Sequence, residues 1–210
     1  MDAVAHFTQL ARYNVWATAR LLDAVRALPE EAYRRDVGLF FKSIHGTLNH
    51  LLVGEHHLWF VRFAEGISPM MALDAELEAD RARLDARLRE GAARWAPLIA
   101  SLAPGRWSET LDYTTTRGTQ ASLPFAATLA HVFNHGTHHR GQITAALTAL
   151  GQPCPVLDFV YYLQNPSKPG ARTCPAPKPA LGRVSRSRSP GSATPSAMKS
   201  LPRSLRPSPM

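Results

Sequence analysis

Four of the nine histidines in this 210-residue chain fall between residues 131 and 139. His131, His135, His138, His139 and Gln142 lie within an arc of about 100° when they are placed on a helical wheel. One face of the helix expected there is therefore almost entirely imidazole. Neutral imidazole is the commonest metal ligand in proteins, and an i, i+4 pair offers two nitrogens to one ion. A solvated face or hydrogen-bonded core histidines are the alternatives, but the clustering favours a metal site.

A further histidine is predicted to face the same site from a second helix. Ser43 is an N-cap candidate, so we expect this helix over about residues 43–64. On its wheel His50, Gly54 and His57 share one narrow stripe, and Gly54 leaves room beside His50. His50 therefore points where a third ligand must point.

Other polar residues on these helices carry weaker patterns. His45 and His56 lie on other faces and are interpreted as surface or packing histidines. Glu55 is more than a quarter turn from His50, so we expect it to support a ligand rather than to be one. Asn14 lies on the buried stripe of a first helix over 3–27, and a buried amide needs hydrogen-bond partners. Asn14 either faces a polar site, where it is a candidate catalytic residue, or forms a hydrogen bond with a neighbouring helix. The sequence leaves both interpretations open.

Three imidazoles from two helices leave coordination positions open on an ion. Structural zinc sites are usually closed by four ligands, whereas three protein ligands and an open position suit catalysis. Neither Cys154 nor Cys174 is placed to complete the set. Zinc and nickel are the preferred divalent ions, with iron, cobalt and manganese as further candidates. Spacing does not choose the helical pair, since His131/His135 and His135/His139 are equally separated.

The elements that must position these side chains are helical. Apolar residues repeat at helical spacing in four segments, over about residues 3–27, 43–64, 73–103 and 124–150. Pro97 is expected to kink or interrupt the third of them. A Thr-rich alternating stretch within about 104–123 predicts a short hairpin that covers one end of the site. The predicted fold class is all-α, a four-helix bundle with a hairpin-like excursion before the last helix.

The charge of the chain is concentrated at its C-terminal end. The formal net charge is +8, but nine of the 24 Lys and Arg residues and none of the 16 acidic ones follow Asn165. We therefore expect a domain over 1–165 and a disordered, basic, Pro/Ser/Arg-rich tail over 166–210. The tail has no aromatic residue for stacking on bases, so it predicts at most weak binding of nucleic acid through charge.

The chain carries no recognisable targeting pattern. Its start lacks a basic region followed by an apolar one, which argues against a signal peptide. No apolar run approaches the roughly 20 residues needed to cross a bilayer, so no membrane partner is expected. Two cysteines make no disulfide framework. The expected location is the reducing cytoplasm.

The order of these motifs resembles the DinB/YfiT-like superfamily of small metal-binding bundles. The matching pieces are Tyr13-Asn14-x-Trp16-Ala17, Asn49-His50-Leu51-Leu52, His131-x-x-Asn134-His135-x-x-His138-His139-Arg140-Gly141-Gln142, Gly151-x-Pro153 and Asp158. They extend over about 1–165, and the long motif of the last helix is the most specific. The tail is no part of the resemblance.

The resemblance implies an up-down-down-up bundle, often dimeric, with a three-histidine metal site. Carried over residue by residue, the ligands are His50, His135 and His139, while His131 and His138 become neighbours. Gln142 shares their face and is a second candidate catalytic residue that orients bound water.

Characterised members of the superfamily imply a function as well as a fold. They include transferases and isomerases that use low-molecular-weight thiols. We therefore expect a cytoplasmic metal-dependent enzyme, a thiol-dependent S-transferase or a hydrolase, that acts on a small molecule as a homodimer. A non-catalytic metal-binding or stress-response interaction protein is the alternative. The damage-inducible name of the family refers to regulation and gives no argument for DNA chemistry.

Overall fold

The computed structural model describes residues 2–164 and the backbone of residues 173–174. Apart from that pair, the predicted tail over 166–210 lies outside the described residues. The chain is mostly helical. The helices are α1 (Ala3–Arg26), α2 (Glu30–Arg34), α3 (Ile44–Leu51), η1 (Leu52–Trp59), α4 (Phe60–Glu65), α5 (Arg81–Ser101), η2 (Pro104–Ser108), α6 (Phe125–Ala149) and α7 (Phe159–Gln164). Within the described residues, no helix is long and apolar enough to cross a membrane.

The first helix begins where its N-terminal amides are capped. The Asp2 carboxylate accepts a hydrogen bond from the Val4 amide at 3.0 Å, which satisfies a backbone donor that has no partner inside the helix. Buried residues such as Phe7, Ala11 and Leu21 follow at helical spacing and form its inner face. Asn14 lies on this face and is completely buried. Its predicted position on the inner stripe is therefore confirmed.

The second long helix is continuous but not regular. Ser43 caps it by accepting a hydrogen bond from the Gly46 amide at 3.0 Å, as expected. Between Leu52 and Trp59 it widens into the π-helical segment η1 before α4 continues to Glu65. Such wide turns are rare and often occur at functional sites. Nothing in the apolar pattern predicts them.

The third long helix begins later than predicted. It starts at Arg81, where the Asp80 side chain accepts a hydrogen bond from the Arg83 amide at 2.8 Å. Residues 66–80 form an irregular segment instead of the expected first turns. Asn49 of α3 holds this segment by accepting from the Glu78 amide at 3.0 Å and donating to the Glu78 carbonyl at 3.1 Å. The helix continues through Pro97 to Ser101.

The predicted hairpin and histidine helix are both present. Strands β1 (Thr110–Thr114) and β2 (Gln120–Pro124) pair antiparallel, and α6 follows β2 directly. Gly118, with φ of 81°, permits the tight turn between them. A second short pair joins β3 (Cys154–Pro155) to β4 (Thr173–Cys174).

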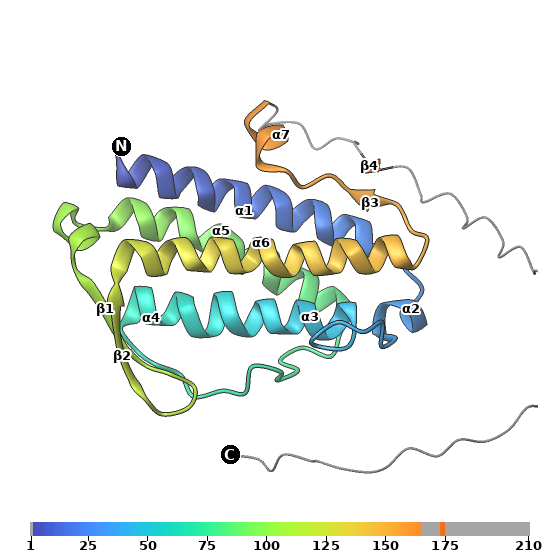
Figure 1. Cartoon of the computed structure of the whole chain (residues 1–210), viewed down its shortest axis with the longest axis horizontal. Coiled ribbons are helices and arrows are strands. Elements are labelled where there is room, and N and C mark those ends of the chain that lie inside the picture. Colours follow the sequence, from blue (N-terminus) through green and yellow to red (C-terminus); the bar gives the residue numbers. More distant parts are fainter. Residues whose placement is uncertain (1, 165–172, 175–210) are drawn as a thin grey trace, which may run out of the picture. The chain divides into compact units, whose positions relative to one another are not determined.

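The long helices lie side by side, and α6 lies between α1 and the α3–η1–α4 helix (Figure 1). The segment over 66–80 runs along the outside of that helix, on the way to α5. Two large clusters of buried apolar side chains fill the interior, one containing Leu21, Leu48 and Leu147 and the other Trp95, Phe125 and Phe133. Since α6 contributes to both clusters, its remaining face is free to carry the histidines.

Candidate metal centre

Three of the predicted residues meet between α3 and α6. The Nε2 atom of His135 lies 3.2 Å from Nε2 of His50 and 3.1 Å from Nε2 of His139. One ligand-type nitrogen from each residue lies within 4.8 Å of the other two. His50 and His139 are buried, whereas His135 is half-buried. The structure thus brings together one side chain from α3 and an i, i+4 pair from α6.

The outer nitrogens of two rings have hydrogen-bond partners that fix their orientation. Nδ1 of His50 donates to the Leu73 carbonyl at 2.8 Å. Nδ1 of His139 lies 2.8 Å from Oε1 of Gln142, which accepts its proton. Because the proton of each neutral ring is then on Nδ1, both Nε2 atoms present lone pairs to the centre. Hydrogen bonds of this kind orient metal-binding imidazoles and make them more basic.

The arrangement fits a cation better than it fits hydrogen bonds among the rings. His135 can donate one Nε2 proton to one neighbour, so the lone pair on Nε2 of the other neighbour would face His135 without a hydrogen between them. Nitrogen ligands of a tetrahedral zinc ion, each about 2.0–2.1 Å from it, are about 3.3–3.4 Å apart. The contacts of 3.1 and 3.2 Å are close to that spacing. A three-histidine group of this geometry could hold a metal ion.

The surroundings keep these imidazoles in the form that binds metal. Burial and the neighbouring rings lower the pKa of His135 to about 3. Burial lowers the pKa of His139 to about 4, against an opposing hydrogen bond from Gln142. Burial also lowers the pKa of His50. All three are therefore neutral near pH 7, and a metal ion displaces no proton from their lone pairs.

Neighbouring side chains shape the space around the three rings. The Phe41 ring stacks on His50, with centroids 3.8 Å apart, and so covers one side of the group. A β-carbon at Gly54 would lie 3.4 Å from Cε1 of His135. The absence of a side chain at Gly54 therefore makes room for His135, rather than for His50 as predicted. Phe40 projects from the same loop with 82% of its surface exposed.

Behind the metal ligands, Asn14 belongs to a buried polar cluster. Its amide donates to the Glu55 carboxylate at 3.1 Å and accepts a hydrogen bond from the Arg140 guanidinium. Arg140 also donates to the Thr137 hydroxyl at 3.2 Å. Burial raises the pKa of Glu55, while Arg140 and Asn14 oppose that rise. These bonds join α1, η1 and α6, which is the helix-to-helix arrangement anticipated as one of two possibilities for Asn14.

Gly136 provides the space for that cluster. A β-carbon there would overlap Oε1 of Glu55 and lie 2.9 Å from Nη1 of Arg140. Glu55 was expected to support a ligand, and it lies against the residue next to His135. Arg140 is part of the long histidine motif, but its spacing did not indicate that it would be the charged neighbour of Glu55.

The other histidines have separate partners. His138 is exposed and accepts from Gln142 at 3.1 Å, whereas the exposed His131 has ring contacts with His135 and Trp59. His57 lies 2.7 Å from an Arg87 nitrogen, away from the His50 stripe predicted for it. The prediction assumed about 100° per residue, and the wide turns of η1 rotate less per residue.

Both histidines interpreted as surface or packing residues are buried. His45 lies 2.9 Å from the Glu76 carboxylate. His56 packs where Gly91 of α5 leaves space for its ring. Neither belongs to the three-histidine group.

Comparison with known proteins places this site in a family. Residues 1–170 match the model of the DinB family. The chain belongs to the DinB family. It is also 27% identical to protein DinB of Bacillus subtilis (strain 168) over 158 residues, which cover 74% of this chain and 92% of that relative. No solved structure matches it significantly.

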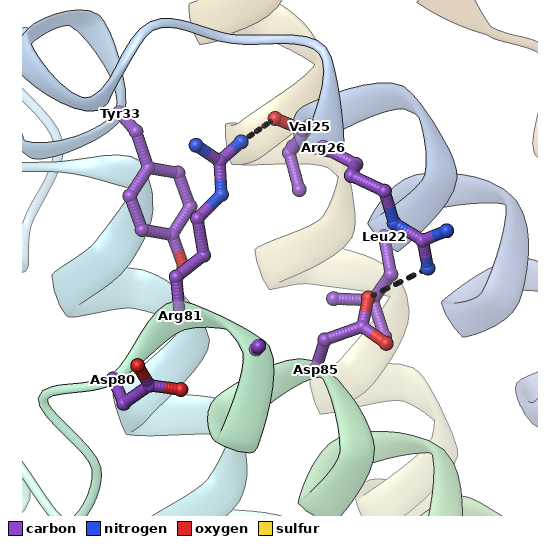
Figure 2. A pocket seen from close by; sticks show the side chains of 8 residues that line it. Leu22, Val25, Arg26, Tyr33, Asp80, Arg81 and Asp85 are labelled. Atoms are coloured by element: carbon purple, nitrogen blue, oxygen red, sulfur yellow. Dashed lines mark hydrogen bonds and ion pairs between the residues drawn. The ribbon is translucent and has the colours of Figure 1, made fainter.

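A hollow elsewhere in this DinB-family chain contrasts with the histidine site. It has a volume of about 440 Å³ and lies between the C-terminal end of α1 and the start of α5 (Figure 2). Arg81 crosses it, stacking over Tyr33 and donating to the Leu28 carbonyl at 2.8 Å, and Arg26 pairs with Asp85 at 3.6 Å. Burial raises the pKa of Tyr33, so its hydroxyl stays protonated. The cations here have partners, and the hollow carries no group of metal ligands.

Proposed function

We propose that this DinB-family protein is a metal-dependent enzyme, a thiol-dependent S-transferase or a hydrolase, whose divalent ion is held by His50, His135 and His139. The observation that carries the proposal is the convergence of their Nε2 atoms at 3.1 and 3.2 Å, with two of the outer nitrogens already bonded. Zinc and nickel are the proposed ions, with iron, cobalt or manganese as substitutes. Three protein ligands leave a position for a substrate atom.

An ion at such a site supplies Lewis acidity, which lowers the pKa of a bound water to about 7 or favours the thiolate form of a bound thiol. The residues of the chain prepare the site for that chemistry. Gln142 orients His139 by accepting a hydrogen bond from Nδ1 of that ring, and the Leu73 carbonyl orients His50 in the same way. The Phe41 ring excludes water from one side of His50.

The two residues proposed as catalytic from the sequence receive different roles here. Gln142 is a positioning residue for His139 and, through its amide, for His138. Asn14 acts on the site through Glu55 and Arg140, because its hydrogen bonds are committed to them. It therefore holds α1 and η1 against the ligand-bearing turns of α6. We further propose the up-down-down-up bundle and the homodimer that are typical of the family.

A cobalt-substituted protein tests the proposal. Addition of 2-mercaptoethanol should produce a new sulfur-to-cobalt charge-transfer band, because a thiol enters the open position. His50→Ala, His135→Ala and His139→Ala should each weaken cobalt binding by at least about 100-fold, since loss even of a residue that only supports a ligand costs 10–100-fold. His57→Ala is the control and should keep the wild-type affinity, because His57 lies 2.7 Å from an Arg87 nitrogen and outside the three-histidine group.

The results separate the possible functions. Unchanged affinity in all three ligand variants would remove the metal site. Tight cobalt binding without a thiol response would favour activation of water over activation of a thiol. A loaded protein that turns over neither electrophile–thiol pairs nor esters would leave the non-catalytic metal-binding role.

A further inference from the structure

A second depression opens beside the histidine face of α6. It has a volume of about 380 Å³ and is lined by Trp59, Tyr113, Leu123, Pro124, Ala127, Thr128 and His131. Its walls come from the end of η1, the hairpin and the first turns of α6, which meet at one end of the helices (Figure 1). A volume near 300 Å³ or above is in the range of small-molecule sites.

The lining of this depression is mainly apolar, and His131 is the polar residue on the side of the metal ligands. Leu123, Pro124 and Ala127 offer only carbon atoms, and Leu123 keeps 41% of its surface exposed. Trp59 and Tyr113 add large aromatic rings with one polar atom each. The Thr128 hydroxyl already donates to the Pro124 carbonyl at 2.8 Å. The imidazole of His131 can form a hydrogen bond with a ligand. A ligand that fits has an apolar body and one polar group.

That polar residue lies toward the metal ligands. His131 precedes His135 by one turn of α6, and their ring centroids are 5.6 Å apart. On its other side His131 contacts Trp59, with centroids 5.5 Å apart, and Trp59 contacts Tyr113 at 5.3 Å. The rings thus form a continuous row from the three-histidine group into the depression.

The wide turns of η1 place Trp59 in this row. In a regular helix, nine residues at about 100° each would put Trp59 on the side opposite to His50. Wide turns advance by roughly 80° per residue, which leaves the two residues within about 40° of each other. The contacts agree, since His50 and Trp59 both touch the histidine face of α6, at His135 and His131.

A buried arginine holds the aromatic wall in place. The Arg62 guanidinium lies 4.8 Å from the Trp59 ring centroid and 4.5 Å from that of Tyr113. It donates to the Thr114 carbonyl at 3.1 Å and is only 5% exposed. Stacking of this kind fixes a ring and strengthens its packing. The wall is therefore formed before any ligand arrives, which lowers the entropic cost of binding.

We propose that this depression binds the apolar body of the substrate, an aryl or compact branched alkyl group, whose reactive polar end passes His131 toward the three-histidine group. The inference rests on the proposed function of that group. The expected substrates are small molecules with a neutral apolar part, and highly charged molecules are not expected to bind here. Trp59, Tyr113 and Leu123 select the apolar part, and His131 bonds the polar group next to it.

The first experiment measures binding without metal. Equilibrium dialysis of the EDTA-treated protein with 2-naphthol should show saturable binding at one site. Ala127→Phe should weaken it by about tenfold or more, because the added ring fills the depression from the exposed side of α6. Ala145→Phe is the matched control, an exposed alanine farther along the same helix and outside the lining, and should stay within about twofold of wild type.

The second experiment links the depression to the ion. Cobalt-loaded protein should bind 3-phenylpropanohydroxamic acid about tenfold more tightly than acetohydroxamic acid, because the phenyl group adds apolar contacts. Ala127→Phe should abolish that preference without changing cobalt affinity. Leu123→Asp, compared with Ser122→Asp on the same exposed strand, repeats the test without adding bulk to α6.

Each result bears on a separate claim. No saturable naphthol binding, or equal binding by Ala127→Phe and Ala145→Phe, would overturn the assignment of the depression even if the protein binds cobalt tightly. Naphthol binding that depends on Ala127, together with an absent phenyl preference, would overturn its link to the ion. Failure of the metal site itself would appear as absent cobalt binding, while the naphthol measurement would be unaffected.

Discussion

Replacing Gly136 by alanine should destabilise the protein, although the same change usually stabilises a helix. In the middle of a helix, alanine is favoured over glycine by about 1 kcal/mol. At Gly136, however, the new β-carbon would overlap Oε1 of Glu55 and lie 2.9 Å from Nη1 of Arg140. Gly141 on the same helix has nothing within 4 Å of an added β-carbon. The two substitutions should therefore have opposite signs.

The magnitudes follow from these surroundings. Overpacking a filled interior costs about 1–3 kcal/mol, and loss of hydrogen bonds to a charged group costs about 1.5–3 kcal/mol. Against the gain of about 1 kcal/mol, Gly136→Ala should lower the free energy of unfolding by about 1.5–5 kcal/mol. Gly141→Ala should raise it by up to about 1 kcal/mol, or roughly 2–4 °C in Tm.

Urea unfolding of the metal-free protein, followed by circular dichroism, measures both changes. The metal is removed with EDTA so that altered ligand binding does not enter the comparison. If Gly136→Ala proves as stable as Gly141→Ala, Glu55 and Arg140 do not occupy the space beside α6, and the proposed support of His135 by that cluster fails.

Three further results are expected. The free energy of unfolding of the metal-free protein should fall between pH 6.5 and 3, because burial lowers the pKa of His56 to about 3 and only the unfolded chain takes up that proton in this range. Urea titrations at several pH values measure the slope of the free energy of unfolding against pH. This slope should be smaller in His56→Leu than in the wild type by about 1.4 kcal/mol per pH unit, and equal slopes would contradict the assigned pKa. Gln142→Ala should weaken zinc binding by about 10–100-fold in a chelator competition, because His139 loses the partner of its Nδ1 proton. Truncation after Asn165 should leave Tm and zinc content unchanged, and a large loss of either would show that the tail contributes to the fold.

The parts of the molecule that the sequence predicted well are those with a long, unbroken period. The helix of the histidines was expected over 124–150 and extends from Phe125 to Ala149, because apolar residues mark its buried face along its whole length. The proximity of His50 to the α6 pair followed from that period together with the family resemblance. The hairpin was predicted from local alternation and Gly118.

The parts that were missed depend on contacts between distant residues. The wide turns of η1 leave no signature in the apolar pattern, so His57 was placed on the wrong stripe. The start of α5 is set by the Asp80 cap and by the hold of Asn49 on Glu78, which are 29 residues apart along the chain. The hydrogen bond between Gln142 and His139 could have been predicted from the sequence, since residues at i and i+3 are neighbours on a helix.

The wide turns of η1 also affect how the chain can be compared with its relatives. Over eight residues they rotate the helix by roughly 140° less than regular turns would, a difference of between one and two residues. A relative with a regular helix would therefore present its equivalent of Trp59 at least one position earlier. An alignment that continues without a gap from His50 to Arg62 would pair residues that face different directions. Correspondence across this stretch has to be established by the side of the helix that a residue occupies.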